Sequence, residues 1–164
     1  MANDAMSNHA NISAQYLTFD LAGEMYGVEI LRVQEIRGWE KVRKIPNTPD
    51  YVKGALNLRG EVVPIVDLRV RFAMENVEYT PVTVVIVLCV QTEQGDNVIG
   101  VVADAVSDVL DIKASEIKEK PNLGAKIDTR FMRGMYVSKQ HMIMLLDVDK
   151  LLNPDEFDGI SGLL

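Results

Sequence analysis

The sequence contains little of the chemistry on which most enzymes depend. Its 164 residues include one cysteine, Cys89, which excludes a disulfide framework and a cysteine-based zinc cage. Its two histidines, His9 and His141, leave little material for a histidine metal site or a catalytic triad. No glycine-rich phosphate loop and no nucleophile elbow is present. The sequence therefore favours a binding protein over an enzyme, and we expect no cofactor and no metal.

Positive charge and long hydrophobic runs are also scarce. Lys and Arg number 17 against 24 Asp and Glu, and a net charge of −7 makes a nucleic-acid partner a poor candidate. The most apolar stretch, Val82 to Val90, is far shorter than the roughly 20 residues of a membrane helix. Residues 1–14 contain neither Lys nor Arg, unlike a secretory signal. We therefore expect a cytoplasmic protein without membrane insertion.

The residues that are present are typical of a folded protein rich in β-structure. Hydrophobic residues make up 48% of the chain and charged residues 25%, as in ordinary globular proteins. Between Gln15 and Leu21 apolar and polar side chains alternate, which indicates a half-buried strand. Similar short segments follow at residues 25–30, 33–39, 41–45, 61–68, 82–90, 98–103, 131–137 and 141–146. Many short strands predict an all-β barrel architecture.

Two prolines modify this pattern. Thr48 and Pro49 suit the start of a helix, so we expect a short helix from Pro49 to about Asn57. Pro64 lacks the backbone N–H that a central strand donates, so we expect strand 61–68 to lie at a sheet edge or to carry a bulge. Further short helices are expected at 115–120 and 147–152.

A weak internal repeat suggests that the chain contains a duplicated unit of about 70 residues, with chance similarity as the alternative. The matches are Gly27-Val28 with Gly100-Val101 (offset 73), Arg59-Gly60 with Arg133-Gly134 (offset 74), and Val66-Asp67-Leu68 with Leu146-Asp147-Val148 (offset 80). Each half is near the lower size limit for an independent core, so the halves should pack together. We expect a flexible arm at residues 1–14, barrel subdomains at 15–81 and 82–152 that can exchange strands, and a tail at 153–164.

Other candidate features have ordinary structural explanations. Cys89 lies in an apolar run, where a thiol behaves as a small core residue. Asp104, Asp108 and Asp111 would share one face only on a helix, and the valines around them favour a strand, so a metal site is not expected. The segment from Ile30 to Arg71 contains nine basic and five acidic residues. This segment is either a solvated mixed surface or a basic face for an acidic partner.

Several longer motifs together resemble the CheW family, the bacterial chemotaxis coupling proteins. The similar segments are Tyr26–Gly38, Ile45–Pro49, Val52–Gly54, Asn57–Arg69, Thr83–Leu88, Gly100–Val102 and Val106–Leu110. The run NLRGEVVPIVDLR at 57–69 is the most specific of them. The resemblance extends over about residues 15 to 152.

This resemblance implies a mainly β fold of two small five-stranded β-barrels packed side by side with short helices. It also implies a non-enzymatic adaptor in chemotaxis signal transduction. Such an adaptor would link the regulatory domain of a CheA-type histidine kinase to the cytoplasmic tip of chemoreceptors, in arrays at the inner face of the membrane. Because that tip is a helical hairpin, recognition would place a helix in an apolar groove.

The resemblance also implies contact residues. The receptor groove would be formed by Val33, Glu35, Arg59, Val84, Val85 and Gly100. The valines would supply apolar area, Gly100 would allow close backbone approach, and Arg59 would form charge-assisted hydrogen bonds. An internal salt bridge from Arg59 to Glu35 or Asp67 is the alternative role. The kinase contact is expected on the strand around Val42 and Ile45.

Three other functions stay open at this point. One is a coupling protein of a non-motility chemosensory pathway. Another is a small-molecule-binding β-barrel, which would need convergent polar groups around a pocket. The third is an interaction module that binds the kinase without changing its activity.

Overall fold

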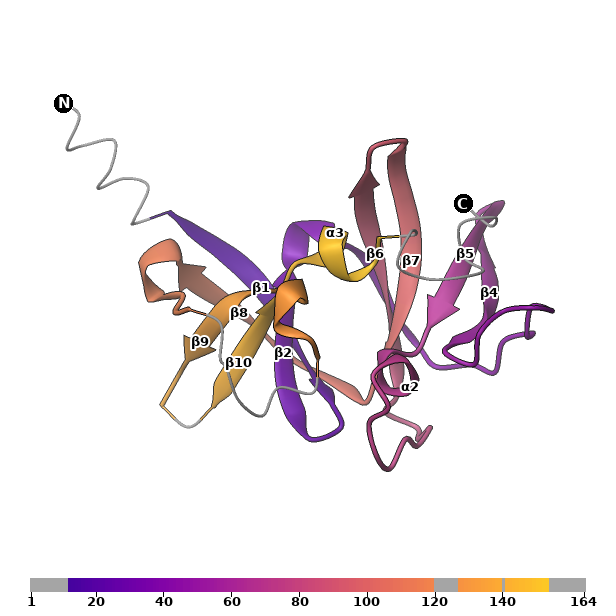
Figure 1. Ribbon diagram of the computed structural model, residues 1–164, viewed down its shortest axis with the longest axis horizontal. Coiled ribbons are helices and arrows are strands. Elements are labelled where there is room, and N and C mark those ends of the chain that lie inside the picture. The colour runs from indigo at the N-terminus through magenta and orange to yellow at the C-terminus, as the bar shows by residue number, and fades with distance from the viewer. Residues whose placement is uncertain (1–11, 120–126, 140, 154–164) are drawn as a thin grey trace.

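Two five-stranded sheets lie side by side in the computed structural model, which describes residues 12–119, 127–139 and 141–153 (Figure 1). Sheet A has the strand order β8-β1-β2-β10-β9, and sheet B has the order β3-β6-β7-β5-β4. The strands are β1 (Ser13–Leu21), β2 (Glu24–Glu29), β3 (Val33–Gly38), β4 (Val52–Leu58), β5 (Glu61–Val66), β6 (Val84–Thr92), β7 (Gly95–Ala103), β8 (Ala105–Lys113), β9 (Met132–Val137) and β10 (Met142–Leu146). The prediction of a mainly β fold built from two five-stranded units is confirmed.

Helices are few and short. They are η1 (Ile30–Arg32), α2 (Leu68–Arg71), η2 (Ala114–Glu116), η3 (Thr129–Phe131) and α3 (Val148–Leu151). In the part of the chain that the structure describes, no helix is long and apolar enough to cross a membrane. Strand β1 begins at Ser13, inside the segment expected to be an arm. Most of that arm (1–11) and of the tail (154–164) lies outside the described residues.

Each sheet takes strands from both halves of the sequence. The hairpin β1–β2 pairs with β8 and β10 in sheet A, while the hairpin β6–β7 pairs with β3 and β5 in sheet B. When each strand of sheet A is replaced by the strand five places earlier or later in chain order, the strand order of sheet B results. The two sheets therefore have the same topology, as a duplicated unit would produce.

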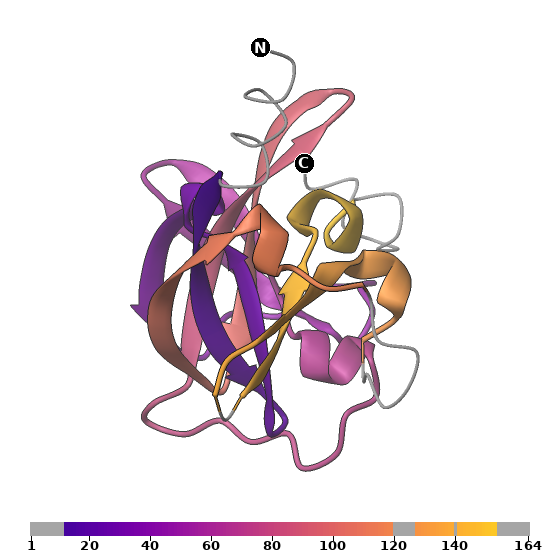
Figure 2. The same cartoon turned by 90° about the vertical axis from the view of Figure 1, so that its left-hand side faces the viewer.

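Short connections explain why the chain changes sheets. Only η1 separates β2 from β3, and only Asp104 separates β7 from β8. Strand β1 is antiparallel to both of its neighbours, β2 and β8, so β2 and β8 run parallel to each other. If β3 took the place of β8 in sheet A, it would follow β2 as a parallel strand of the same sheet. A connection between parallel strands of one sheet needs about a dozen residues. The chain instead passes directly into the other sheet at both places (Figure 1). Figure 2 shows the two sheets one behind the other.

The structure corrects one part of the repeat. Arg59-Gly60 forms the turn between β4 and β5, with φ angles of 55° and 86°, whereas Arg133-Gly134 lies inside β9. The counterpart of Gly134 is Gly54, at an offset of 80. A Cβ on Gly54 would lie 2.2 Å from the carbonyl oxygen of Arg43, and one on Gly134 would lie 2.5 Å from that of Lys118. The match of Asp67 with Asp147 holds, because these residues cap α2 and α3.

Two local predictions were wrong. The expected helix at 49–57 is largely strand β4, because pairing with β5 and complete burial of Val52 outweigh the helix-start signal at Thr48-Pro49. Strand β5 is not an edge strand, since it lies between β7 and β4. The parallel pairing of β5 with β7 begins at Ile65, so Pro64 itself does not have to donate a hydrogen bond to β7. The irregularity in the β4–β5 ladder lies on the partner strand β4, between Val52 and Gly54.

The protein contains three apolar clusters, of which the main core joins the two sheets. The main core contains side chains from both sheets, such as Phe19 and Tyr26 of sheet A and Ile86 and Leu88 of sheet B. The sheet B outer cluster consists of Val63, Ile65, Val85, Val87 and Val102. The sheet A outer cluster consists of Tyr16, Ile112, Ile143 and Leu145. Each sheet is therefore buried on one face against its neighbour and carries a smaller cluster on the other.

Candidate docking surfaces

Five of the six expected groove residues lie on three neighbouring strands of sheet B. Val33 and Glu35 are on the edge strand β3, Val84 and Val85 are on β6, and Gly100 is on β7. Because successive side chains on a strand point to opposite faces, these residues divide between two surfaces. Val33 and Val84 pack against the main core, whereas Glu35 lies opposite Val87 of the sheet B outer cluster.

Val85 and Gly100 lie inside the protein. Val85 is 2% exposed and belongs to the sheet B outer cluster. A Cβ on Gly100 would lie 2.5 Å from Cδ1 of Ile65 and 2.8 Å from Cγ1 of Val85. Gly100 therefore permits close packing between strands of this sheet. Both residues can affect a partner only by shaping the strands beside them.

Arg59 occupies the exposed turn between β4 and β5. Gly60 N–H donates to Oδ1 of Asn57 at 2.9 Å, and this bond stabilises the turn. The positive φ of Arg59 is uncommon for a residue with a long side chain. Among the described residues Arg59 makes no hydrogen bond or ion pair with its side chain, and Asp67 is engaged elsewhere. The guanidinium is therefore available to a partner.

The segment around Val42 and Ile45 follows β3. It makes one isolated bridge, between Arg43 and Ala55, and no regular strand. Val42 packs against the sheet B outer cluster and Ile45 against the main core, so both are half-buried. The exposed side chains of this segment are basic: Lys41, Arg43 and Lys44.

Some of the basic residues between 30 and 71 serve internal contacts. Both terminal nitrogens of Arg32 donate to the carboxylate of Asp149, at 2.9 and 2.6 Å. Asp149 also accepts from the backbone N–H of Gln91, so this pair joins η1 and α3 to β6. The hydrogen bonds to Asp149 raise the pKa of Arg32. The basic surface is consequently smaller than the sequence suggests.

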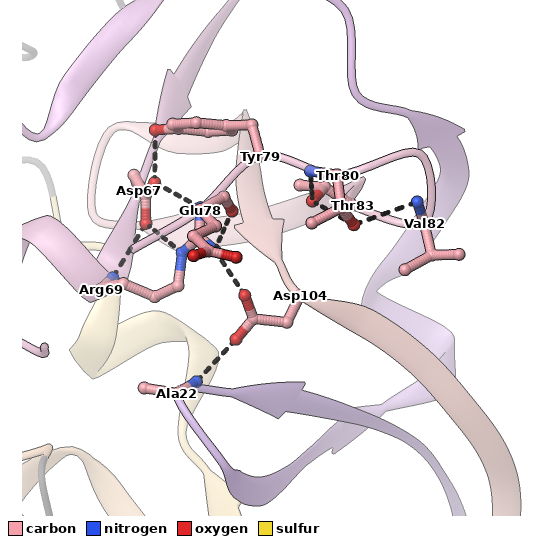
Figure 3. A network of polar contacts seen from close by, with 9 residues as sticks. All are labelled: Ala22, Asp67, Arg69, Glu78, Tyr79, Thr80, Val82, Thr83 and Asp104. Atoms are coloured by element: carbon pink, nitrogen blue, oxygen red, sulfur yellow. Dashed lines mark hydrogen bonds and ion pairs between the residues drawn. The ribbon is translucent and has the colours of Figure 1, made fainter. Parts of the chain in front are cut away.

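Arg69 forms the centre of a buried polar network at the other junction of the two sheets (Figure 3). Its Nε and one terminal nitrogen donate to the two oxygens of Asp67, at 3.0 and 2.8 Å. The other terminal nitrogen donates to Asp104 at 2.5 Å and to the carbonyl of Glu78 at 2.8 Å. Asp104 also accepts from the N–H of Ala22 at 2.6 Å.

Every buried side-chain nitrogen and oxygen of this network has a hydrogen-bond partner, which allows the charges to be buried. Arg69 is 1% exposed and Asp67 is fully buried. Burial opposes the charge of Arg69, but the hydrogen bonds and charges of Asp67 and Asp104 outweigh it and raise its pKa. Burial and the hydrogen bond to Asp67 likewise raise the pKa of Tyr79. Sequence reasoning missed this network, although charged residues directly after the apolar run 62–66 were a usable signal.

The remaining titratable groups give little support for ligand chemistry. An open depression of about 690 Å³ is lined by Asp20, Glu24, Asp104 and His141 together with Gly23 and methionines. Glu24 accepts from Tyr26 and Asp104 is bound to Arg69, so these carboxylates are committed internally. Burial and the charge of Asp96 raise the pKa of Cys89. Within residues 12–119, 127–139 and 141–153, no group of His, Cys, Asp or Glu is arranged to hold a metal ion.

Comparison with known proteins decides the family. The family model described as "CheW-like domain" matches residues 15–156. The chain belongs to the CheW-like family. It is 45% identical over 152 residues to the chemotaxis protein CheW of Klebsiella aerogenes, covering 93% of this chain and 89% of the relative. It is 33% identical over 153 residues to that of Rhizobium meliloti, covering 93% and 96%.

A solved structure agrees with this assignment. The crystal structure of the scaffolding protein TtCheW from Thermoanaerobacter tengcongensis has a TM-score of 0.75 to this CheW-like chain, with 29% identity. The similarity covers 88% of this chain and 91% of that protein. The chain is therefore a chemotaxis scaffold protein of the CheW type in both sequence and fold.

Proposed function

We propose that this protein is a non-enzymatic adaptor that couples chemoreceptors to a CheA-type histidine kinase at the inner face of the membrane. The observation that carries the proposal is the family match, which extends over nearly all described residues. The fold gives further support, because two sheets with short loops provide edges and turns for docking. In the depression beside Asp20, the carboxylates of Glu24 and Asp104 are bound to Tyr26 and Arg69, which weakens the case for a small-molecule site there.

The receptor surface that we propose combines the edge strand β3 with Arg59. Val33, Glu35 and Val84 are half-buried, and Ile36 presents 41% of its surface to solvent beside them. An exposed apolar side chain on an edge strand suits the apolar face of a receptor helix. Arg59, which is exposed and whose side chain pairs with none of the described residues, would bind an acidic group on the receptor. Val85 and Gly100 would act by supporting these strands.

The kinase surface that we propose is the segment 41–45. Val42 and Ile45 fix this segment to sheet B, and the exposed Lys41, Arg43 and Lys44 give it local positive charge. Because the whole chain has a net charge of −7, this basic segment would orient an acidic partner and speed its association.

Binding and activity measurements with purified proteins test the proposal. Calorimetry with the regulatory domain of the cognate kinase should show saturable one-to-one binding. Adding receptor fragments should then activate the kinase only in the presence of this protein. No binding to kinase or receptor at about 100 μM, where even weak interfaces are detected, would refute the coupling function.

Charge and apolar variants locate the two surfaces. Arg59→Ala and Ile36→Asp should each weaken receptor binding by about tenfold and leave kinase binding unchanged. The double variant Arg43→Glu with Lys44→Glu should do the opposite and slow kinase association most at low salt. Lys113→Ala, an exposed change on sheet A, is the matched control. Circular dichroism must show unchanged folding in every variant, and equal loss of both partners would contradict the separate surfaces.

A further inference from the structure

The two halves of this chain depend on each other for their sheets. The ladders β1–β8, β2–β10, β3–β6 and β5–β7 all join the first half to the second. Among the described residues, the ladders within a half are the hairpins β1–β2, β4–β5, β6–β7 and β9–β10. Isolated two-stranded hairpins are at best marginally stable in water. Each half thus presents unpaired strand edges and an apolar face that only the other half covers.

One connection, residues 72–83, links the halves covalently. Its first part is fastened to the first half, because the carbonyl of Glu78 accepts from Arg69 and the hydroxyl of Tyr79 donates to Asp67 at 2.6 Å. The ring of Tyr79 also stacks on Trp39, with centroids 4.5 Å apart (Figure 3 shows Tyr79 above Asp67). The chain therefore leaves the first half only after Tyr79.

A tight turn at Thr80–Thr83 then directs the chain into β6. The N–H of Thr80 donates to Oγ1 of Thr83 at 2.8 Å, and the N–H of Thr83 donates to the carbonyl of Thr80 at 3.1 Å. Val82 within the turn is 64% exposed. Opening this turn would break these hydrogen bonds. The carbonyl of Thr83 also accepts from the N–H of Trp39 at 2.9 Å, so Thr83 continues the pairing of β6 with β3 of a first half.

We propose that Thr80–Thr83 is a hinge through which two copies of this chain exchange halves. In the exchanged dimer, the first half of one copy pairs with the second half of the other. Every ladder and every core contact is then reproduced twice, so the monomer and the dimer differ in free energy chiefly at the hinge and in association entropy. The partner is a second copy because its halves match these edges residue for residue.

A disulfide between the halves tests this exchange in the full-length chain. Gln15 and Asp111 are exposed and lie opposite each other in the β1–β8 ladder. Opposite residues of antiparallel strands have the Cα separation that a disulfide requires. Gln15→Cys and Asp111→Cys are introduced together with Cys89→Ser. In the monomer the disulfide closes within one chain, whereas in the exchanged dimer it joins two chains.

Two conditions should populate the dimer. Refolding from denaturant at about 1 mM rather than 1 μM should produce a dimer that persists on dilution, because exchange requires unfolding. Deleting Pro81 and Val82 should favour the dimer further, since a shortened turn cannot return the chain to its own first half. A two-residue Gly-Ser insertion at the same place is the control and should restore the monomer.

The readout separates exchange from other outcomes. After oxidation, a non-reducing gel should show the isolated dimer at twice the mass of the 18.3 kDa chain. A dimer in solution that runs as a single chain on this gel would be a surface association and would overturn the proposal. Absence of any dimer after refolding of the unshortened chain at high concentration would overturn it as well, even where the deletion variant fails to fold.

Discussion

The buried network around Arg69 gives the sharpest prediction about stability. Arg69→Met introduces an apolar side chain of similar length and removes the donors to Asp67, Asp104 and Glu78. Asp67, which is fully buried, would keep only the hydroxyl of Tyr79 and the N–H at position 69. Breaking one partner of such a buried pair typically costs about 3–5 kcal/mol, because the remaining charge is left without compensation.

That cost should be visible in ordinary unfolding experiments. Domains of this size are stable by roughly 5–15 kcal/mol, so the variant should lose about a fifth or more of its stability. A chain of this length should lose about 10 °C in Tm. Urea titration followed by the fluorescence of Trp39 is a direct assay, since this ring stacks on Tyr79 beside the network. Circular dichroism at the same urea concentrations checks that both probes report one transition.

Two further variants define what would refute this reasoning. Arg59→Met changes an exposed arginine whose side chain bonds to no residue in the described part of the chain, so it should shift stability by less than about 0.5 kcal/mol. Adding Asp67→Asn to Arg69→Met removes the unpaired buried charge of Asp67 and should recover part of the lost free energy of unfolding. If Arg69→Met cost less than about 1 kcal/mol, or as little as Arg59→Met, the network would not be the stabilising feature described here.

Three other predictions follow from local geometry. Gly54→Ala should cost about 2 kcal/mol or more in urea titration, because its Cβ would lie 2.2 Å from the carbonyl of Arg43 at a φ of +152°. Gly38→Ala, where a Cβ meets nothing within 4 Å, is its control. Asp149→Asn should cost about 1 kcal/mol by weakening the paired bonds to Arg32. Burial and the charge of Asp104 raise the pKa of Asp20, so the ionised carboxylate lowers stability as pH rises through that raised value. Asp20→Asn should therefore raise Tm by about 1–2 °C at pH 7 and by nothing near pH 3, and an equal shift at both values would contradict this cause.

The strand pattern was predictable from sequence because each sheet has one well-covered face. Alternation at 15–21 and the apolar run at 82–90 correspond to β1 and β6, with boundaries that differ by about two residues. Pairing overrode local signals at 49–57, where Thr48-Pro49 indicates a helix but β4 completes sheet B. Sequence alone cannot weigh such a contact, because the partner strand lies several residues further along the chain.

Five of the expected groove residues lie on neighbouring strands, but their orientation was not predictable from the sequence. The motifs located Val33, Glu35, Val84, Val85 and Gly100 on neighbouring strands, which the ladders between β3, β6 and β7 bring together. Which of these side chains faces solvent depends on the register of the strands. In the β3–β6 ladder the register shifts between Val33 and Glu35, so the face on which a side chain lies changes within two residues. The charge count of segment 30–71 likewise does not tell which charges reach solvent, since Arg32 and Arg69 form internal ion pairs.

The exchange of hairpins between sheets also sets the order of events during synthesis on the ribosome. Sheet B is incomplete until β7 ends at Ala103, and sheet A, which takes β8, β9 and β10 from the second half, is incomplete until Leu146 has been made. A nascent chain that has emerged only to β5 holds two hairpins and a lone edge strand, with no complete sheet to bury them. Folding must therefore wait for almost the whole chain, and the apolar faces of the first half are exposed to chaperones throughout that interval.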